Sequence, residues 1–204
     1  MNLLVFILNG WYIIPIGLLL FISLAVFIER LLVINKAGKE DATFMKRIKD
    51  YVHSGKVDSA VNLCRMTHTS TSRMIEKGIS RLGHPVNDIQ VAIENISHIE
   101  IAKLKKGFLW ISTTAIAAPM LGLLGTVISM VRAFFNVANA GPNVDIRLLF
   151  SGIYEALLTT VAGLIAGIIA LLLYNYLVAR VNKVANNMES RSMEFLDLLN
   201  EPTN

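Results

Sequence analysis

The chain has few of the residues that soluble enzymes use for their chemistry. It is 204 residues long and contains a single cysteine, Cys64, so it cannot form an internal disulfide, and this suits a reducing compartment. Its 4 histidines have neither metal-ligand spacing nor a cysteine partner. The sequence also lacks a phosphate-binding loop, a nucleotide fingerprint and a plausible nucleophile–base pair. We therefore expect no metal, no cofactor and no ordinary enzymatic activity.

Charged side chains are also scarce. Asp, Glu, Lys and Arg make up 17% of the chain and hydrophobic residues 54%, with a mean hydropathy of +0.56. This composition excludes an ordinary soluble domain and indicates an integral membrane protein. The formal net charge is +4, but acidic residues are interleaved with the basic ones, so we expect no nucleic-acid binding.

Three apolar stretches are long enough to cross a bilayer as helices, which takes roughly 20 residues. They cover residues 11–34, 107–131 and 148–179, and the third carries Glu155 as its only charge. Backbone groups in lipid must find their hydrogen bonds within the segment, so each stretch is expected to be helical. The sequence therefore predicts an all-α integral membrane protein with three transmembrane helices.

The first stretch has the properties of a retained membrane anchor. It has no basic region before the apolar run and no small-residue cleavage site, and it continues directly into Glu29 and Arg30. We expect an uncleaved span with Trp11 and Tyr12 as interfacial anchors and with Glu29 and Arg30 at the opposite interface.

The distribution of Lys and Arg predicts the orientation. Most of these residues lie in 35–108, whereas the link at 136–151 holds only Arg147. Basic residues are retained on the cytoplasmic side, so the long loop and the tail after Arg180 are expected inside. The N-terminus and the short link, with its turn-forming residues at 139–143, are expected outside.

The inside segment has helical spacing with two breaks, at Ser54-Gly55 and at His84-Pro85. Beyond Pro85 no breaker occurs before Gly107, which predicts one helix running on into the second span. The third span likewise continues toward Pro202. We expect spans two and three to extend into a cytoplasmic helical bundle, with divisions at 1–34, 35–106, 107–180 and 181–204.

Spans two and three carry small and hydroxylated residues at helical intervals, so that each set lies on one face. The sets are Ser112, Ala115, Pro119, Gly122, Thr126 and Ser129 in span two, and Gly152, Ala156, Thr160, Gly163, Gly167 and Ala170 in span three. The faces can be helix-packing surfaces, or they can line a cavity with Thr126 and Thr160 supplying hydroxyls. Both interpretations hold if a partner helix packs there, against Ala115, Pro119, Gly122, Ala156, Gly163 and Gly167. Pro119 loosens its helix or is merely tolerated there.

Glu155 is a functional-site hypothesis because a carboxylate inside a membrane span is costly. An interfacial, solvated carboxylate is the alternative. Its helical neighbours Ala156, Thr159 and Ala162 share the small-residue face, which favours an inward-facing side chain. Arg132, near the same end of span two, either pairs with Glu155 or reaches the headgroups.

Two segments resemble a known family. They are Ala-Pro-Met-Leu-Gly-Leu-Leu-Gly-Thr-Val at 118–127, and Gly-Ile-Tyr-Glu-Ala-Leu-Leu-Thr-Thr-Val-Ala-Gly-Leu at 152–164, which Tyr174-Asn175 follows. Here the chain resembles the ExbB/TolQ/MotA family of proton-channel motor subunits, in its ExbB/TolQ branch. It departs from the family at 166–170, where many members have a proline, and at Thr159, where relatives often have alanine.

The resemblance implies a pentamer in the bacterial inner membrane, with a periplasmic N-terminus and a cytoplasmic C-terminus. Spans two and three would line a pore that holds the single membrane helices of ExbD/TolR-like subunits. Thr126, Glu155 and Thr160 would lie at the pore's functional positions, beside Thr159. The titratable group that the chain lacks deeper in these spans would come from that partner.

The activity implied is use of the proton motive force to energise TonB-dependent outer-membrane transport through a TonB-like protein. A TolQ-like subunit of a Tol-Pal envelope system and a non-conducting membrane scaffold remain alternatives. A small-solute transporter is disfavoured, because the chain has no repeat of broken helices.

Overall fold

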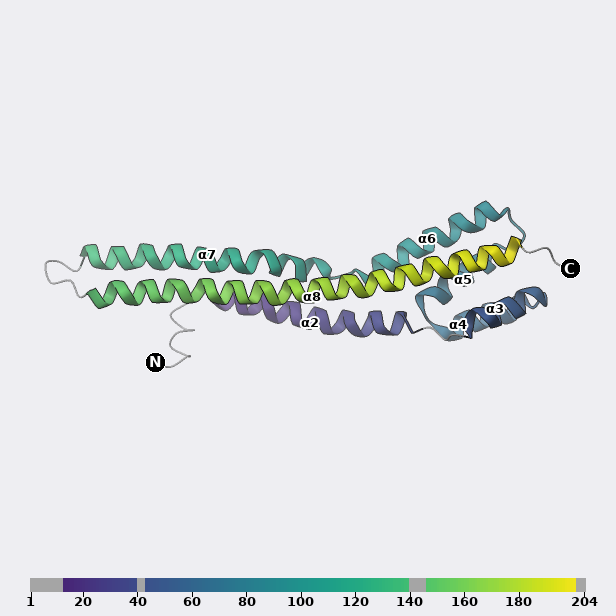
Figure 1. Cartoon of the computed structure of the whole chain (residues 1–204), viewed down its shortest axis with the longest axis horizontal. Coiled ribbons are helices and arrows are strands. Elements are labelled where there is room, and N and C mark those ends of the chain that lie inside the picture. The colour runs from purple at the N-terminus through teal and green to yellow at the C-terminus, as the bar shows by residue number, and fades with distance from the viewer. Residues whose placement is uncertain (1–12, 40–42, 140–145, 201–204) are drawn as a thin grey trace. The chain divides into compact units, whose positions relative to one another are not determined.

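The computed structural model of the chain describes residues 13–39, 43–139 and 146–200. Within these ranges the chain forms α-helices and no strands, which confirms the predicted all-α class. The helices, labelled in Figure 1, are α2 (Ile13–Ala37), α3 (Phe44–His53), α4 (Val57–Thr67), α5 (Ser70–Ile79), α6 (Val86–Leu104), α7 (Phe108–Asn139) and α8 (Ile146–Asn200). The expected anchors Trp11 and Tyr12, and the expected turn after Asn139, lie outside the described residues.

Three helices are long and apolar enough to cross a membrane, as predicted. They are Ile13–Ala37, Phe108–Asn139 and Leu149–Asn200. The third is continuous to Asn200, so the prediction that it extends beyond its apolar part is confirmed.

The prediction of one helix running through the loop into the second span is wrong. Helix α6 ends at Leu104 and α7 begins at Phe108. Between them Gly107 has φ +84°, a left-handed conformation that glycine adopts readily and that ends a right-handed helix. The two expected breaks are confirmed, because Gly55 has φ +67° between α3 and α4 and Pro85 directly precedes α6.

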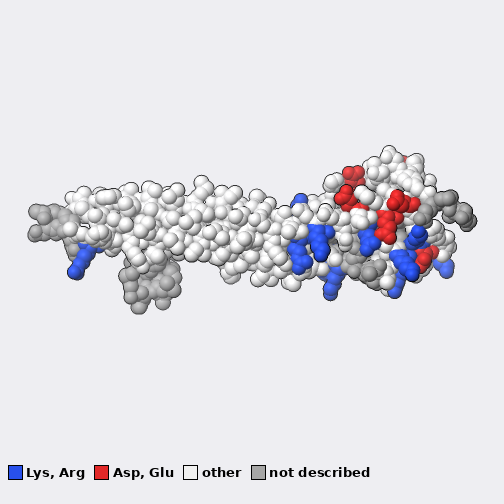
Figure 2. Space-filling view, viewed as in Figure 1, with Lys and Arg blue, Asp and Glu red and all other residues white. Residues whose placement is uncertain are grey.

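The chain divides into two compact units. The first, which we call the span unit, comprises Met1–Ile28 and Gly107–Tyr176; the second, the polar unit, comprises Glu29–Lys106 and Leu177–Asn204. In Figure 2 the charged side chains visible on this face gather over the polar unit, while nearly all the described surface of the span unit is uncharged. Helices α2 and α8 contribute to both units.

In the span unit, α7 and α8 lie side by side at close range (Figure 1). A Cβ built on Gly163 would lie 2.6 Å from the carbonyl oxygen of Ala118 and 2.8 Å from the Cα of Gly122. Small residues allow such an approach, and dispersion contacts then hold membrane helices together. Helix α2 joins this pair through Ile16, which packs with Ala118 and Ala166.

The polar unit has an apolar core of its own. Its fully buried side chains include Ile48, Met74, Ile75, Ile93 and Phe195, which come from α3, α5, α6 and α8. Water-exposed helices are stabilised mainly by burying such a face. A Thr69–Ser72 capping box starts α5, with the Ser72 amide donating to the Thr69 hydroxyl over 3.1 Å.

Candidate functional site

The hydroxyls of Thr126 on α7 and Thr160 on α8 are in direct hydrogen-bond contact within the span unit. Thr126 Oγ1 also lies 3.1 Å from the carbonyl oxygen of Ala156, and Thr160 Oγ1 lies 3.3 Å from that of Gly122. Each threonine therefore reaches a backbone carbonyl of the opposite helix. Both side chains remain half-buried, so part of their surface is accessible.

This threonine pair can be hydrogen-bonded in two directions. A hydroxyl donates one proton and accepts others. Thr160 can donate to Thr126 while Thr126 donates to the Ala156 carbonyl, or Thr126 can donate to Thr160 while Thr160 donates to the Gly122 carbonyl. Both hydroxyl protons have an acceptor in either arrangement, so reversing the pair leaves no donor unmatched.

Thr159 has a different environment from its neighbour. It is 1% exposed, and its hydroxyl donates to the Ala156 carbonyl over 2.7 Å. A Cβ on Gly125 would lie 2.9 Å from the Thr159 hydroxyl oxygen, so the side chain fills the contact between α7 and α8. Its position indicates packing between the helices.

Glu155 is half-buried on α8, next to Ala156, whose carbonyl accepts from Thr126. Within the described residues, no ion pair joins the Glu155 carboxylate to Arg132 or to another base. Along α8, Glu155 therefore directly precedes the residue whose carbonyl accepts from Thr126. Its side chain keeps an accessible surface.

The structure brings together the small residues predicted for a partner helix, in one contact between α7 and α8. Gly122 lies against Gly163, and a Cβ on Gly167 would lie 2.5 Å from Pro119 Cγ and 3.1 Å from the Ala115 carbonyl oxygen. Gly122, Ala156, Gly163 and Gly167 are buried in this contact. The chain itself therefore covers these four, whereas Ala115 and Pro119 remain half-buried.

The span unit also buries polar side chains that the sequence did not assign to the proton pathway. Ser23 of α2 donates to Thr114 of α7 over 2.7 Å in the buried interior. Ser129, which belongs to the predicted hydroxyl stripe, is 3% exposed, and its Oγ has no hydrogen-bond partner among the described residues. Isolated serines and threonines in apolar runs carry no signal that distinguishes a buried pair from a lipid-facing one.

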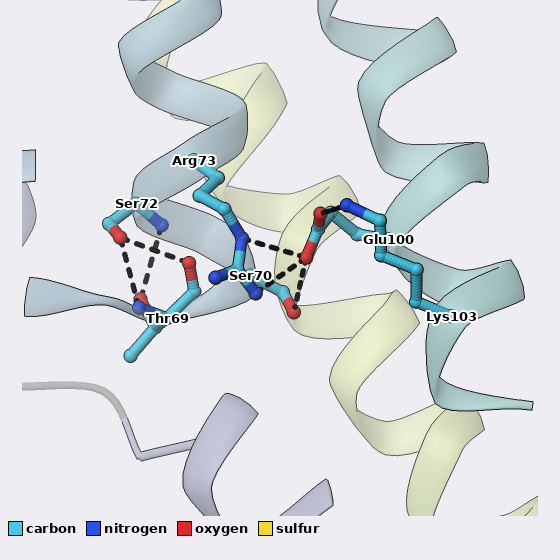
Figure 3. Close-up of polar contacts among 6 residues, drawn as sticks. All are labelled: Thr69, Ser70, Ser72, Arg73, Glu100 and Lys103. Carbon is cyan, nitrogen blue, oxygen red and sulfur yellow. Dashed lines mark hydrogen bonds and ion pairs between the residues drawn. The ribbon is translucent and has the colours of Figure 1, made fainter. Parts of the chain in front are cut away.

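The polar unit holds a buried carboxylate that sequence reasoning treated only as part of a helix. Glu100 is 3% exposed and lies between two bases (Figure 3). Its Oε2 is 2.6 Å from Arg73 Nη2, and its Oε1 is 2.7 Å from Lys103 Nζ. Ser70 also donates to Oε2, over 3.3 Å. Burial raises the pKa of Glu100, but the hydrogen bonds and charges of Lys103 and Arg73 outweigh it and leave the pKa below its ordinary value.

Comparison with known proteins finds the same family that the two sequence motifs resemble. Residues 66–190 match the MotA/TolQ/ExbB proton channel family. The Tol-Pal system protein TolQ of Haemophilus influenzae is 30% identical over 189 residues, which cover 87% of this chain and 82% of that protein. The biopolymer transport protein ExbB of Aquifex aeolicus is 37% identical over 81 residues, which cover 40% of this chain and 54% of that protein.

A third relative, the ExbB-like 1 biopolymer transport protein of Synechocystis sp., is 37% identical over 102 residues, or 48% of this chain. The chain spans only 40% of the length of that protein. The family match covers more than half of the chain, including α7, most of α8 and the threonine pair. The chain is a three-span, multi-pass membrane protein and belongs to the MotA/TolQ/ExbB proton channel family.

Proposed function

We propose that the chain is the proton-conducting, multi-spanning subunit of a bacterial inner-membrane complex that energises TonB-dependent outer-membrane transport. The observation that carries this proposal is the Thr126–Thr160 contact, which can be hydrogen-bonded in either direction. A reversible hydroxyl pair can pass a proton between neighbouring groups without leaving a buried donor unpaired. Half-burial of both threonines supports access by a neighbouring group.

A second chain supplies the titratable group in this proposal. Glu155 is the only Asp or Glu among the described residues of the span unit. Threonine hydroxyls relay protons but do not hold charge near neutral pH. One carboxylate near one end of the span therefore does not provide enough titratable groups for a proton path across the membrane. An ExbD/TolR-like subunit with one membrane helix would place a carboxylate beside Thr126 and Thr160.

The exposed apolar surface of α7 and α8 supports assembly. Leu123 and Val127 of α7 are 60% and 54% exposed, and Leu157 and Val161 of α8 are 60% and 50% exposed. In a bilayer such surface meets lipid or other membrane helices. We propose that copies of the chain associate through part of it, as a pentamer around the partner helices.

The orientation proposed places the polar unit in the cytoplasm. Most of the Lys and Arg residues lie in that unit, and basic residues are retained on the cytoplasmic side. The N-terminus would then be periplasmic. Energy from proton flow would reach the periplasm through the partner subunits and a TonB-like protein.

A TolQ-like role in a Tol-Pal envelope system is the second candidate. It is favoured by the Haemophilus influenzae TolQ match, which extends over 87% of this chain. Purification of the chain from native membranes separates the two roles. Recovery of a TonB-like protein supports the first role, and recovery of Tol-Pal components with no TonB-like protein would replace it.

Proton conduction is tested with Thr126→Val and Thr160→Val, which keep the side-chain shape and remove the hydroxyl. The chain is co-purified with its single-span partner and reconstituted in vesicles, and a pH-sensitive dye reports flux under an imposed potential. Each variant should lower flux by about fivefold, since a lost hydrogen bond is worth about 1 kcal/mol. Thr160→Ser keeps the hydroxyl and should conduct.

Wild-type flux in the valine variants would exclude the threonine pair from the path. No flux in the wild-type complex would favour the non-conducting scaffold. Circular dichroism and recovery of the partner check that each variant still folds and assembles.

A further inference from the structure

We propose that a basic cavity in the polar unit binds the phosphate group of an anionic membrane lipid. The cavity has a volume of about 630 Å³ and lies among α2, α5, α6 and the turn that follows α6. The arginine and lysine side chains that line it are Arg30, Lys36, Arg73, Lys103 and Lys106, His68 lines it as well, and Glu100 is the only carboxylate among its described lining residues. The proposal does not depend on ion conduction.

Glu100 neutralises part of this charge and leaves the rest available. It accepts hydrogen bonds from Arg73 and Lys103, which it holds in place (Figure 3). Lys36 and Lys106 line the same cavity and are exposed, and neither has an acidic partner among the described residues. The two ammonium groups are therefore the ones available to an added anion.

A second observation, independent of the charge count, also points to a missing acceptor. Arg30 lines the cavity and uses Nη2 to contact Glu29, while Nη1 lies 3.5 Å from the Lys103 carbonyl oxygen. Its Nε is buried and has no hydrogen-bond partner within the described part of the chain. Since buried donors are nearly always matched, an acceptor oxygen is expected here. Phosphate oxygens suit an arginine donor well.

The cavity lies where a lipid headgroup would be. Arg30 follows the uncharged part of α2, and Lys106 precedes the uncharged start of α7, so both belong at the end of an apolar span. Val33, Ala37 and Leu104 give the cavity an apolar wall beside its basic residues. A free phosphate would use only the basic part, whereas a lipid would use both. Basic pockets of this kind at the membrane surface recognise anionic headgroups.

The test uses the full-length chain purified in a mild detergent, with lipid binding measured by native mass spectrometry. Phosphatidylglycerol is the anionic probe and phosphatidylcholine the zwitterionic one, and inorganic phosphate is added as a competitor. Phosphatidylglycerol should bind more tightly than phosphatidylcholine. An equal concentration of inorganic phosphate should not displace it.

The variant pair Lys36→Gln/Lys106→Gln should weaken phosphatidylglycerol binding about 30-fold, since each lysine near a membrane surface contributes about 1 kcal/mol. The matched control is Lys46→Gln/Lys56→Gln, which removes two exposed lysines of the polar unit outside the cavity. This control should bind as the wild type does. Lys36→Arg/Lys106→Arg should restore binding, and helix content should be unchanged in every variant.

Three results would overturn the proposal. Unchanged phosphatidylglycerol binding in the Lys36→Gln/Lys106→Gln variant would exclude the cavity. An equal loss of phosphatidylglycerol binding in the Lys46→Gln/Lys56→Gln control would show that the lipid is attracted only by the net charge of the polar unit. Displacement of the lipid by an equal concentration of inorganic phosphate would assign the site to free phosphate.

Discussion

Gly163 of α8 lies so close to Gly122 of α7 that a Cβ built on Gly163 would be 2.8 Å from the Gly122 Cα. The same Cβ would be 2.6 Å from the Ala118 carbonyl oxygen, and neither is the flexible end of a side chain. A methyl group added at Gly163 would therefore push the two helices apart. The distance between α7 and α8 is what places Thr160 in contact with Thr126.

We predict that Gly163→Ala destabilises the chain by about 1–3 kcal/mol, the usual cost of overpacking. The free energy of unfolding in mixed micelles measures this directly. Gly17→Ala on α2 is the control, because a Cβ there meets nothing within 4 Å. It should be neutral or stabilising by up to about 1 kcal/mol, since alanine is the better helix former. Equal effects of the two substitutions would contradict a close α7–α8 contact.

The helices of this fold could largely be predicted from the sequence, because apolar length and the breakers at Gly55 and Pro85 are local signals. The break at Gly107 was misjudged. A glycine at the edge of an apolar run is compatible with a continuous membrane helix, and only its φ of +84° shows that the helix ends. The break before α5 depends on the Thr69–Ser72 capping box, a short motif easily lost among other hydroxyl residues.

The site could be predicted only in part. Helical spacing and the family motifs selected Thr126, Glu155 and Thr160, and the structure places the two threonines in contact. Spacing along one helix cannot show what lies opposite it, so the sequence left open whether the glycine faces pack against a partner helix, and only the structure shows that they meet in an α7–α8 contact. For the same reason Glu100 was not linked to Arg73, which lies 27 residues earlier in the chain.

The buried hydrogen bond between Ser23 and Thr114 should stabilise the packing of α2 against α7. A double-mutant cycle with Ser23→Ala and Thr114→Val isolates the interaction of the two hydroxyls. We expect a coupling energy of about 0.6 kcal/mol, and at most about 1.7, as for other hydrogen bonds between membrane helices. Thr114 also reaches the Trp110 carbonyl of its own helix at 2.9 Å, which keeps the value low. A coupling energy of zero would mean that the hydrogen bond between the two hydroxyls does not stabilise the packing of α2 against α7.

Glu100→Gln should destabilise the polar unit by about 1–3 kcal/mol near neutral pH. Removing one partner of a fully buried ion pair costs about 3–5 kcal/mol, and the 46% and 63% exposure of the Arg73 and Lys103 side chains reduces that figure. Thermal melting followed by circular dichroism measures the change. Glu94→Gln is the matched control, because Glu94 is 65% exposed on the same helix and should cost little.

The contribution of Glu100 should depend on pH. Its pKa in the folded chain lies below the ordinary value of 4.5, so the folded state favours the ionised carboxylate. Its stabilisation is then fully present above about pH 5 and is lost as the pH falls through the folded-state pKa. The difference in melting temperature between wild type and Glu100→Gln should shrink on acidification below about pH 4.5. A difference that grows on acidification would contradict this sign.

Cys64 should react slowly with thiol reagents although it has no disulfide partner. Burial, with a smaller contribution from the Glu76 charge, raises its pKa from 9.0 to about 12. The thiolate fraction near neutral pH then falls about a thousandfold, and the greater nucleophilicity of a more basic thiolate recovers about thirtyfold of this. We therefore expect maleimide alkylation to be slower by about thirtyfold or more than at an exposed cysteine. Met66→Cys in a Cys64→Ala background provides that comparison, since Met66 is 80% exposed.

The pH dependence of alkylation separates a raised pKa from restricted access alone. Below its pKa, a thiol reacts about tenfold faster for each pH unit, because the thiolate fraction grows in proportion. The rate at the engineered cysteine should level off above about pH 9, near the ordinary thiol pKa. The rate at Cys64 should continue to rise, since its pKa is about 12. If both rates level off at the same pH, the slow reaction of Cys64 comes from access to the thiol and its pKa is not raised.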